Sequence, residues 1–258
     1  MQPLFFTFKL MCLVALAWKI HPDFPLLISA NRDEFFHRPT LPLHRWEDGF
    51  YAGKDLQGGG TWMGFHPDGK WALLTNYRDF RQKRQAKTSR GVLVSDFLSS
   101  PLSPENYLDQ IWQKQAEFDG FNLLVSDGDR LFYLSNYGNE PTEILPGIHG
   151  LSNGLLNDPW PKTELAKRQL EKVLSKPAPE NLLSILKSEE KYPAELLPNT
   201  GVPQETEKDL SAQLIRMPPS YGTVSASAVL RNKQGQTLIR ERSFAWDHSN
   251  FEDSQFQF

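Results

Sequence analysis

The stretch from Met11 to Pro39 constrains the fold more than any other part of the chain. It holds two apolar runs, residues 12–20 and 26–30, which are separated by a short segment with two prolines. Each run has the length and composition of a buried strand, and the short connection predicts that the two pair as a hairpin.

One thiol and one dense charge cluster lie at matching ends of these two predicted strands. The first strand begins with Cys12, the only cysteine of the protein, and the second leads into Asn31-Arg32-Asp33-Glu34. Antiparallel pairing brings the start of one strand to the end of the other, so we expect Cys12 to face the charged residues. Strand alternation would place Arg32 and Glu34 on one face of the sheet, with Asn31 and Asp33 on the other.

The remainder of the chain alternates between predicted hairpins and helices. Apolar runs around glycine-containing turns predict hairpins of residues 62–65 with 71–76, 121–126 with 131–136, and 225–230 with 237–244. Amphipathic segments predict helices over residues 89–98, 104–118, 163–174 and 179–188, with Ser103 as an N-cap. We expect loops over residues 35–46 and a surface excursion over residues 190–219. The pattern predicts an α+β fold of two packed antiparallel sheets with helices outside.

Composition narrows the class of protein. A chain of 258 residues can form one large domain, and a net charge of −3 provides no global field that attracts nucleic acid or membrane. A single cysteine cannot form an internal disulfide, which favours a reducing compartment. Residues 58–60, Gly-Gly-Gly, lack the following Lys-Ser/Thr of a phosphate-binding loop and predict a close backbone passage.

The N-terminus allows two interpretations. Residues 1–17 resemble a signal peptide with a cleavage site after Ala17, but Lys9 is their only basic residue and cleavage would remove a predicted strand. The stretch is also too short to span a bilayer. We therefore expect a cytoplasmic protein without stable membrane insertion. Residues 1–10 would be an N-terminal extension, with translation starting at Met11, and residues 11–258 would form a single domain.

A lone cysteine can be a small buried hydrophobe, a metal ligand or a nucleophile. No second cysteine or spaced histidine pair supports a metal site, and we expect neither metal nor cofactor. If Met11 were the initiator and were removed, Cys12 would gain a free α-amine, whose ordinary pKa of about 7.7–8.0 suits a base. Arg32 would lower the pKa of the thiol, and Asp33 or Glu34 would orient the amine.

Several short motifs occur together and in order. Met-Cys-Leu-Val at 11–14, Ala-Asn-Arg-Asp-Glu-Phe at 30–35 and Gly-Gly-Thr-Trp-Met-Gly at 59–64 resemble the NRDE family, relatives of the Transport and Golgi organisation 2 protein. Further matches lie at residues 74–78, 151–154, 160–162 and 221–223. The resemblance implies an N-terminal-nucleophile (Ntn) hydrolase-like αββα four-layer sandwich, and a distant likeness to penicillin V acylase-type cysteine amidases.

The resemblance also implies roles for single residues. Cys12 matches the nucleophile, and Asn153 resembles the amidase asparagine that donates to the oxyanion. Without gaps, Glu34 takes the position of the acid on the amidases' second strand, and Arg32 lies one position away from their arginine. Arg32 and Glu34 are the expected pair, with Asp33 as the second choice for the acid.

Four further positions are implied to bind the substrate: Asn31, Trp62, Asn76 and Arg78. NRDE relatives commonly read Tyr-Gly-Thr-Arg near residue 221. Val224 stands in place of that arginine in this chain, so one cation of the pocket is missing.

Three classes of function remain open. The first is an N-terminal-cysteine hydrolase of a small amide or ester substrate, and the second is a binding or trafficking protein for haem, lipid or acyl-coenzyme A. The third, a nucleic-acid-associated protein, is supported only by a basic run and opposed by the net charge. The run is Arg78, Arg81, Lys83, Arg84, Lys87 and Arg90. We expect it to bind an anionic ligand or to be a solvated loop, and the Asn-Arg-Asp-Glu cluster could likewise be a surface turn.

Overall fold

The computed structural model describes residues 11–82, 86 and 88–258. The predicted extension, residues 1–10, lies outside this range, as do three cations of the basic run, Lys83, Arg84 and Lys87. Of Met11, only the backbone belongs to the described part.

The first sheet contains the stretch around which the chain is organised. Its strands run in the order β10-β1-β2-β12-β13-β14, and β11 pairs with β12 at one end. Their bounds are β1 (Met11–Trp18), β2 (Leu26–Phe35), β10 (Gly147–Leu151), β11 (Arg216–Met217), β12 (Tyr221–Arg231), β13 (Thr237–Phe244) and β14 (Phe251–Gln257). Strands β1 and β2 form the predicted hairpin, and neighbours on both sides make them central.

The second sheet has the order β3-β4-β5-β6-β7-β8-β9 and is a simple antiparallel meander. Its strands are β3 (Thr40–Arg45), β4 (Tyr51–Asp55), β5 (Met63–Phe65), β6 (Trp71–Asn76), β7 (Phe121–Ser126), β8 (Leu131–Ser135) and β9 (Thr142–Glu143). The three predicted hairpins are confirmed as β5–β6, β7–β8 and β12–β13.

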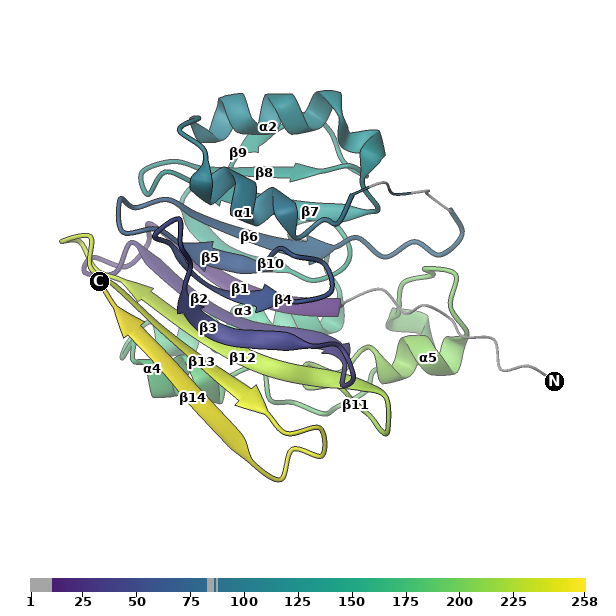
Figure 1. The fold of residues 1–258 in the computed structure, drawn as a ribbon. Coiled ribbons are helices and arrows are strands. Elements are labelled where there is room, and N and C mark those ends of the chain that lie inside the picture. The colour runs from purple at the N-terminus through teal and green to yellow at the C-terminus, as the bar shows by residue number, and fades with distance from the viewer. Residues whose placement is uncertain (1–10, 83–85, 87) are drawn as a thin grey trace.

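Helices cover the outer faces of the two sheets (Figure 1). Helices α1 (Val92–Ser99) and α2 (Pro104–Gln113) pack on the second sheet, while α3 (Pro161–Val173) and α4 (Pro179–Ser184) pack on the first. The chain also forms α5 (Gln204–Asp209) and two single turns of 3₁₀ helix, η1 (Gln115–Glu117) and η2 (Ala194–Leu196). The predicted four-layer αββα sandwich is confirmed, and Ser103 caps α2 by accepting a hydrogen bond from Asn106 N.

The side chains of β1 show why its sequence is apolar throughout. Val14, Leu16 and Trp18 face the second sheet, where the ring centroid of Trp18 lies 6.2 Å from that of Trp71. The alternate residues pack under α3 and α4; they are Leu13, Ala15 and Ala17. A strand that is buried on both faces needs apolar residues at every position.

Two predictions about local structure are wrong, and one alternative that the sequence left open is excluded. Residues 35–46 contain strand β3 rather than only loop, because a polar edge strand lacks the apolar pattern that was used to find strands. The Asn-Arg-Asp-Glu cluster is no surface turn, since β2 continues through it to Phe35 and pairs with β12 along its whole length. Residues 190–219 are only partly on the surface, since Glu207, Leu210 and Gln213 are buried.

Candidate functional site

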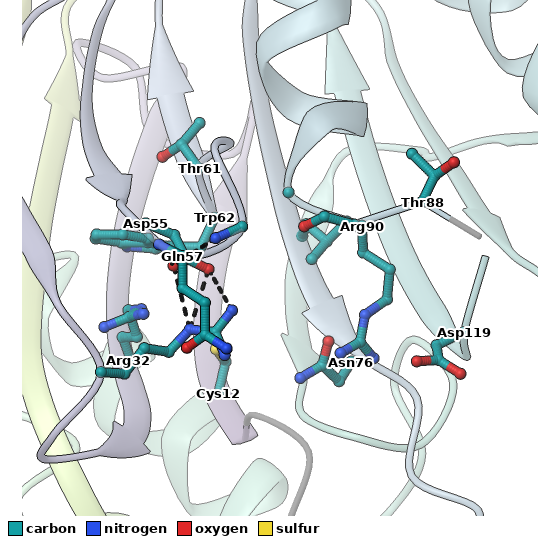
Figure 2. A pocket seen from close by; sticks show the side chains of 15 residues that line it. Cys12, Arg32, Asp55, Gln57, Thr61, Trp62, Asn76, Thr88, Arg90 and Asp119 are labelled. Carbon is teal, nitrogen blue, oxygen red and sulfur yellow. Dashed lines mark hydrogen bonds and ion pairs between the residues drawn. The ribbon is translucent and has the colours of Figure 1, made fainter. Parts of the chain in front are cut away.

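A pocket of about 260 Å³ lies between the two sheets at the end where β1 begins and β2 ends. Cys12 and Arg32 line it from the first sheet, and Asp55 and Asn76 line it from the second. The side chains of both sheets converge on this space, as Figure 2 shows. The pocket is therefore built where the predicted hairpin brings its thiol and its charges together.

Cys12 and Arg32 occupy directly opposite positions of the β1–β2 ladder, as the hairpin predicted. Cys12 is only 7% exposed, and burial raises the pKa of its thiol to about 12. The negative charge of Asp33 raises this pKa further, while Arg32 and a hydrogen bond from the backbone of Asp33 lower it. In the chain that carries residues 1–10, desolvation therefore outweighs the guanidinium and the pKa is raised. The low pKa expected for a form that begins at Cys12 stays a prediction.

Arg32 is held rigidly in the space between the sheets. Its guanidinium lies 4.2 Å from the ring centroid of Trp62, and its Nη2 is 3.3 Å from Glu34 Oε2. Glu34 also accepts from the backbone N–H of Phe35 and lies 3.3 Å from the Nε of Arg38. Burial nevertheless raises the pKa of Glu34 above its ordinary value. Arg32 and Glu34 share one face of β2, which confirms the predicted alternation.

Asp33 lies on the opposite face of β2 and is fully buried. Its Oδ1 accepts a hydrogen bond of 2.6 Å from Thr223 Oγ1, and its Oδ2 has no hydrogen-bond partner among the described residues. Burial raises the pKa of Asp33 to about 6, against the opposing charge of Lys162. Lys162 is buried too, and burial together with Arg78 lowers its pKa to about 8.

Asn31 and Asn153, two other predicted site residues, support the backbone near the pocket rather than line it. Asn31 faces the helices, where its amide donates to the carbonyl oxygens of Leu186 and Gln213. Asn153 is fully buried, and its amide donates to the carbonyl oxygen of Asn76 at 2.9 Å. Of the predicted substrate-binding residues, Asn76 and Trp62 line the pocket.

The described members of the basic run, Arg78, Arg81 and Arg90, do not form one surface. Arg78 is buried and pairs with Glu207 at 2.7 Å, outside the Cys12 pocket, and exposed Arg81 pairs with Asp79 at 2.8 Å. Arg90 alone among its described members lines the pocket.

Arg90 and Arg38 are pocket residues that were not predicted as site residues. Figure 2 shows the guanidinium of Arg90 reaching down between Asn76 and Asp119. Its Nη1 donates to the Gly120 carbonyl oxygen, and burial lowers its pKa to about 10. Arg38 pairs with Asp55 at 2.6 Å. Sequence patterns identified Arg90 only as a member of the basic run. Its place in the pocket depends on contacts with residues far away in the chain, which local patterns do not show.

The glycine run has the structural role that the sequence predicted. A Cβ on Gly60 would come within 2.2 Å of the backbone carbon of Gly91, and the N–H of Thr61 donates to the Gly91 carbonyl oxygen at 3.1 Å. This contact ties the loop that carries Trp62 to the segment that carries Arg90. The close passage thereby shapes one wall of the pocket.

The described residues lack two kinds of feature. Within residues 11–82, 86 and 88–258, no helix combines the length and apolar character needed to cross a membrane. Over the same residues, no group of three or more His, Cys, Asp or Glu side chains is placed to hold a metal ion.

Known proteins resemble the chain over nearly its whole length. The Transport and Golgi organisation 2 family model matches residues 11–245. The bovine Transport and Golgi organization protein 2 homolog is 31% identical, over 90% of this chain and 93% of its own. The human homologue is also 31% identical, over 96% of this chain and 99% of its own. The Drosophila melanogaster Transport and Golgi organization protein 2 is 28% identical over 64% of this chain. The chain therefore belongs to the Transport and Golgi organisation 2 family.

Proposed function

We propose that the chain, in a form that begins at Cys12, is an N-terminal-cysteine hydrolase of a small acyl amide or ester. The observation that carries the proposal is the position of Cys12. Its thiol lines a pocket between the sheets, opposite Arg32 and within electrostatic reach of the buried carboxylate of Asp33. A cytoplasmic location suits this chemistry, because a reducing compartment keeps a single thiol free.

Removal of the residues before Cys12 would create the base that the thiol needs. An α-amine titrates near neutral pH, so it can accept the thiol proton, and its positive charge would favour the thiolate. Asp33 is better placed than Glu34 to orient that amine. Glu34 is already engaged by Arg32, Arg38 and a backbone N–H, whereas Asp33 Oδ2 accepts no hydrogen bond from the described residues.

The reaction would proceed in two steps. The α-amine takes the thiol proton, and the thiolate attacks the carbonyl carbon of the substrate to form a tetrahedral oxyanion. The amine then returns the proton to the leaving nitrogen or oxygen as that bond breaks, which leaves an acyl-thioester. Water, deprotonated by the same amine, hydrolyses the thioester and restores the thiol. Polar groups of the pocket, among them the side chain of Asn76, would stabilise the oxyanion.

The size of the pocket favours a small substrate. Its volume of about 260 Å³ lies just below the roughly 300–1,000 Å³ that is typical of ligand sites. Trp62 and Leu74 supply apolar wall, while Arg38 and Arg90 supply hydrogen-bond donors. A short acyl group with one polar substituent would match this lining.

A second candidate is a non-catalytic binding or trafficking protein for haem, lipid or acyl-coenzyme A. The raised thiol pKa favours it for a chain that keeps residues 1–10, because a protonated buried thiol is a poor nucleophile. Haem fits the residues poorly. The Cys12 pocket, as built from the described part of the chain, has no histidine, tyrosine or methionine in its lining, and a buried thiol with a raised pKa is a weak iron ligand.

The proposal can be tested with two forms of the protein. One form begins at Cys12 after removal of Met11, and the other retains residues 1–10. Both are assayed against short-chain p-nitrophenyl esters and aminomethylcoumarin amides, with Cys12→Ser and Cys12→Ala variants of each. We expect hydrolysis only by the form with a free N-terminal cysteine, and at least a hundredfold loss in Cys12→Ala.

Two results would count against the proposal. Equal hydrolytic activity of both forms would show that the α-amine of Cys12 does not act as the base. Lack of hydrolysis by a correctly folded form that begins at Cys12, across the whole substrate series, would leave the binding protein as the better interpretation.

A further inference from the structure

A second pocket of about 280 Å³ adjoins the Cys12 pocket. The two share the side chains of Arg32, Arg38 and Trp62. The second pocket extends away from Cys12 over β12, β13 and β14. Val224 lines it from the point where the register of β12 against β2 shifts, between Thr223 and Ser225.

Aromatic side chains dominate the apolar part of this second pocket. Phe35, Phe36, Trp62, Phe244 and Trp246 all line it, and Trp246 is 59% exposed at its edge. Aromatic faces attract cations through the negative electrostatic potential above the ring. The aromatic side chains alone would accept many apolar ligands. The charged side chains that line the pocket therefore decide which ligands it prefers.

Glu241 supplies that charge. It is only 4% exposed, yet its side chain lines the pocket. Its Oε1 accepts one hydrogen bond of 2.7 Å from the backbone N–H of Leu43, and the described residues form no ion pair with it. Burial raises the pKa of this carboxyl to about 7. A buried carboxylate without a directly paired cation is costly, so a positively charged ligand group would be favoured beside it.

The two arginines of the pocket do not reverse this preference. Arg32 is paired with Glu34 at 3.3 Å, and Arg38 is paired with Asp55 at 2.6 Å. Their direct partners are carboxylates outside the second pocket, while the positive charge of Arg32 still lowers the pKa of Glu241 and offsets part of the effect of burial. Glu252, on β14, adds another acid to the lining. Glu241 and Glu252 are therefore the two acidic side chains of this pocket that form no ion pair with a described residue.

We propose that this second pocket binds an ammonium group, primary or quaternary, carried on an apolar body that packs against the aromatic side chains. Glu241 contacts the cation, and Trp246 covers it from the exposed edge. The site stands independently of hydrolysis at Cys12. If the proposed function also holds, the substrate is an acyl compound with a cationic substituent that reaches past Arg32 and Trp62.

The test uses the full chain and three probes of similar size and different charge: benzyltrimethylammonium, benzyl alcohol and benzoate. Isothermal titration gives the affinities at pH 8, where Glu241 is ionised. Indole N–H signals in NMR spectra show whether Trp246 and Trp62 respond, with Trp246→Phe used for assignment. We expect the ammonium probe to bind at least tenfold more tightly than either of the others and to shift both signals.

Substitutions identify the carboxylate responsible. Glu241→Gln keeps an oxygen for the Leu43 N–H and removes only the charge, so we expect at least a tenfold loss of affinity for the ammonium probe. Glu205→Gln, at an exposed glutamate of α5, serves as the matched control and should leave the affinity unchanged. Trp246→Ala removes an exposed ring and should weaken binding severalfold, which gives a second test if Glu241→Gln does not fold.

Three outcomes would overturn the inference. The first is equal affinity for the ammonium probe and benzoate, and the second is unchanged binding in a folded Glu241→Gln variant. The third is the lack of any shift of the Trp246 signal at millimolar concentrations of the ammonium probe.

Discussion

Arg32 lies directly opposite Cys12 on the neighbouring strand, and of all the groups that lower the pKa of the thiol it has the largest effect. The effect is still smaller than that of burial, so the thiol of the chain that carries residues 1–10 stays protonated at neutral pH. The site thus holds the cation that a thiolate requires, but in a dry environment that opposes the charge.

The first prediction concerns alkylation of Cys12. In the chain with residues 1–10, iodoacetamide should react with a pH midpoint well above the roughly 8.5 of a free cysteine, because burial disfavours the thiolate. In a chain that begins at Cys12, the positive charge of the α-amine should lower the midpoint. Intact mass measured against time at each pH provides both values.

Arg32→Ala should raise the midpoint in either form, since the variant loses the main charge that stabilises the thiolate. Arg45→Ala, at an exposed arginine of β3, should leave the midpoint where it is. A midpoint that is equal in Arg32→Ala and the parent protein would show that the guanidinium does not act on the thiol.

The second prediction concerns stability and pH at Glu241. The folded-state pKa of about 7 lies above the ordinary 4.5, so the native state holds the proton more tightly than the unfolded state does. Stability should therefore fall as the pH rises from about 4.5 to 7 and change little above that. The difference corresponds to about 3 kcal/mol. Glu241→Gln should be more stable than the parent protein at pH 8 and similar at pH 4.

Urea unfolding followed by tryptophan fluorescence at both pH values checks this second prediction. The control is Glu205→Gln, at an exposed glutamate. This substitution should change the free energy of unfolding only slightly, and by the same amount at both pH values. A constant difference between Glu241→Gln and the parent protein across this range would contradict the raised pKa.

The third prediction concerns the buried charges Lys162 and Asp33. Lys162→Met removes the charge that most strongly favours ionised Asp33, so the pKa of Asp33 should rise further. Lys162 Nζ donates to the carbonyl oxygen of Leu210 and acts on Asp33 through its charge, without a direct ion pair, so the loss should lie below the roughly 3–5 kcal/mol of a broken buried ion pair. The loss should be larger at pH 8, where Asp33 must ionise, than at pH 5, where it is protonated.

The double variant Asp33→Asn, Lys162→Met should recover part of that stability at pH 8, since it leaves no unpaired charge. Lys172→Met, at an exposed lysine of the same helix, is the control and should have little effect. If the two single substitutions were additive in thermal or urea unfolding, Lys162 and Asp33 would not be coupled.

The fourth prediction concerns the passage of Gly60 beside Gly91. The Cβ of Gly60→Ala would meet backbone that no side-chain rotation can clear, so the variant should lose about 3 kcal/mol of stability. Gly138→Ala is a fair comparison, because the nearest atoms to its Cβ would lie at an ordinary 3.6 Å. That variant should stay within about 0.5 kcal/mol of the parent protein. Equal unfolding midpoints for the two variants would show that the close passage is not required.

Local patterns in the sequence predicted much of the fold. The hairpin turns, the amphipathic helices and the Ser103 cap depend on residues only a few positions apart, and the structure confirms them. The alternation that separates Arg32 from Asp33 follows from strand geometry alone. The Gly60 passage was predicted because glycine is needed wherever two backbones approach closely.

Other features were decided only by the tertiary structure. Arg90 reaches the Cys12 pocket because β6, α1 and the glycine loop pack together, and no pattern within its own segment indicates that contact. Lys162, within the motif at residues 160–162, and Glu207, within the predicted surface excursion, are both buried, and no local pattern indicated that burial.

The protonation state of Cys12 likewise depends on both local sequence and tertiary packing. The sequence determined by itself which residues would meet, because strand pairing and side-chain alternation are local rules that a single hairpin obeys. The tertiary structure decided how much water would remain around them, because burial sums the contributions of both sheets and the helices behind them. Desolvation outweighs the charge of Arg32, so the sign of the thiol pKa shift followed from the packing of the whole fold.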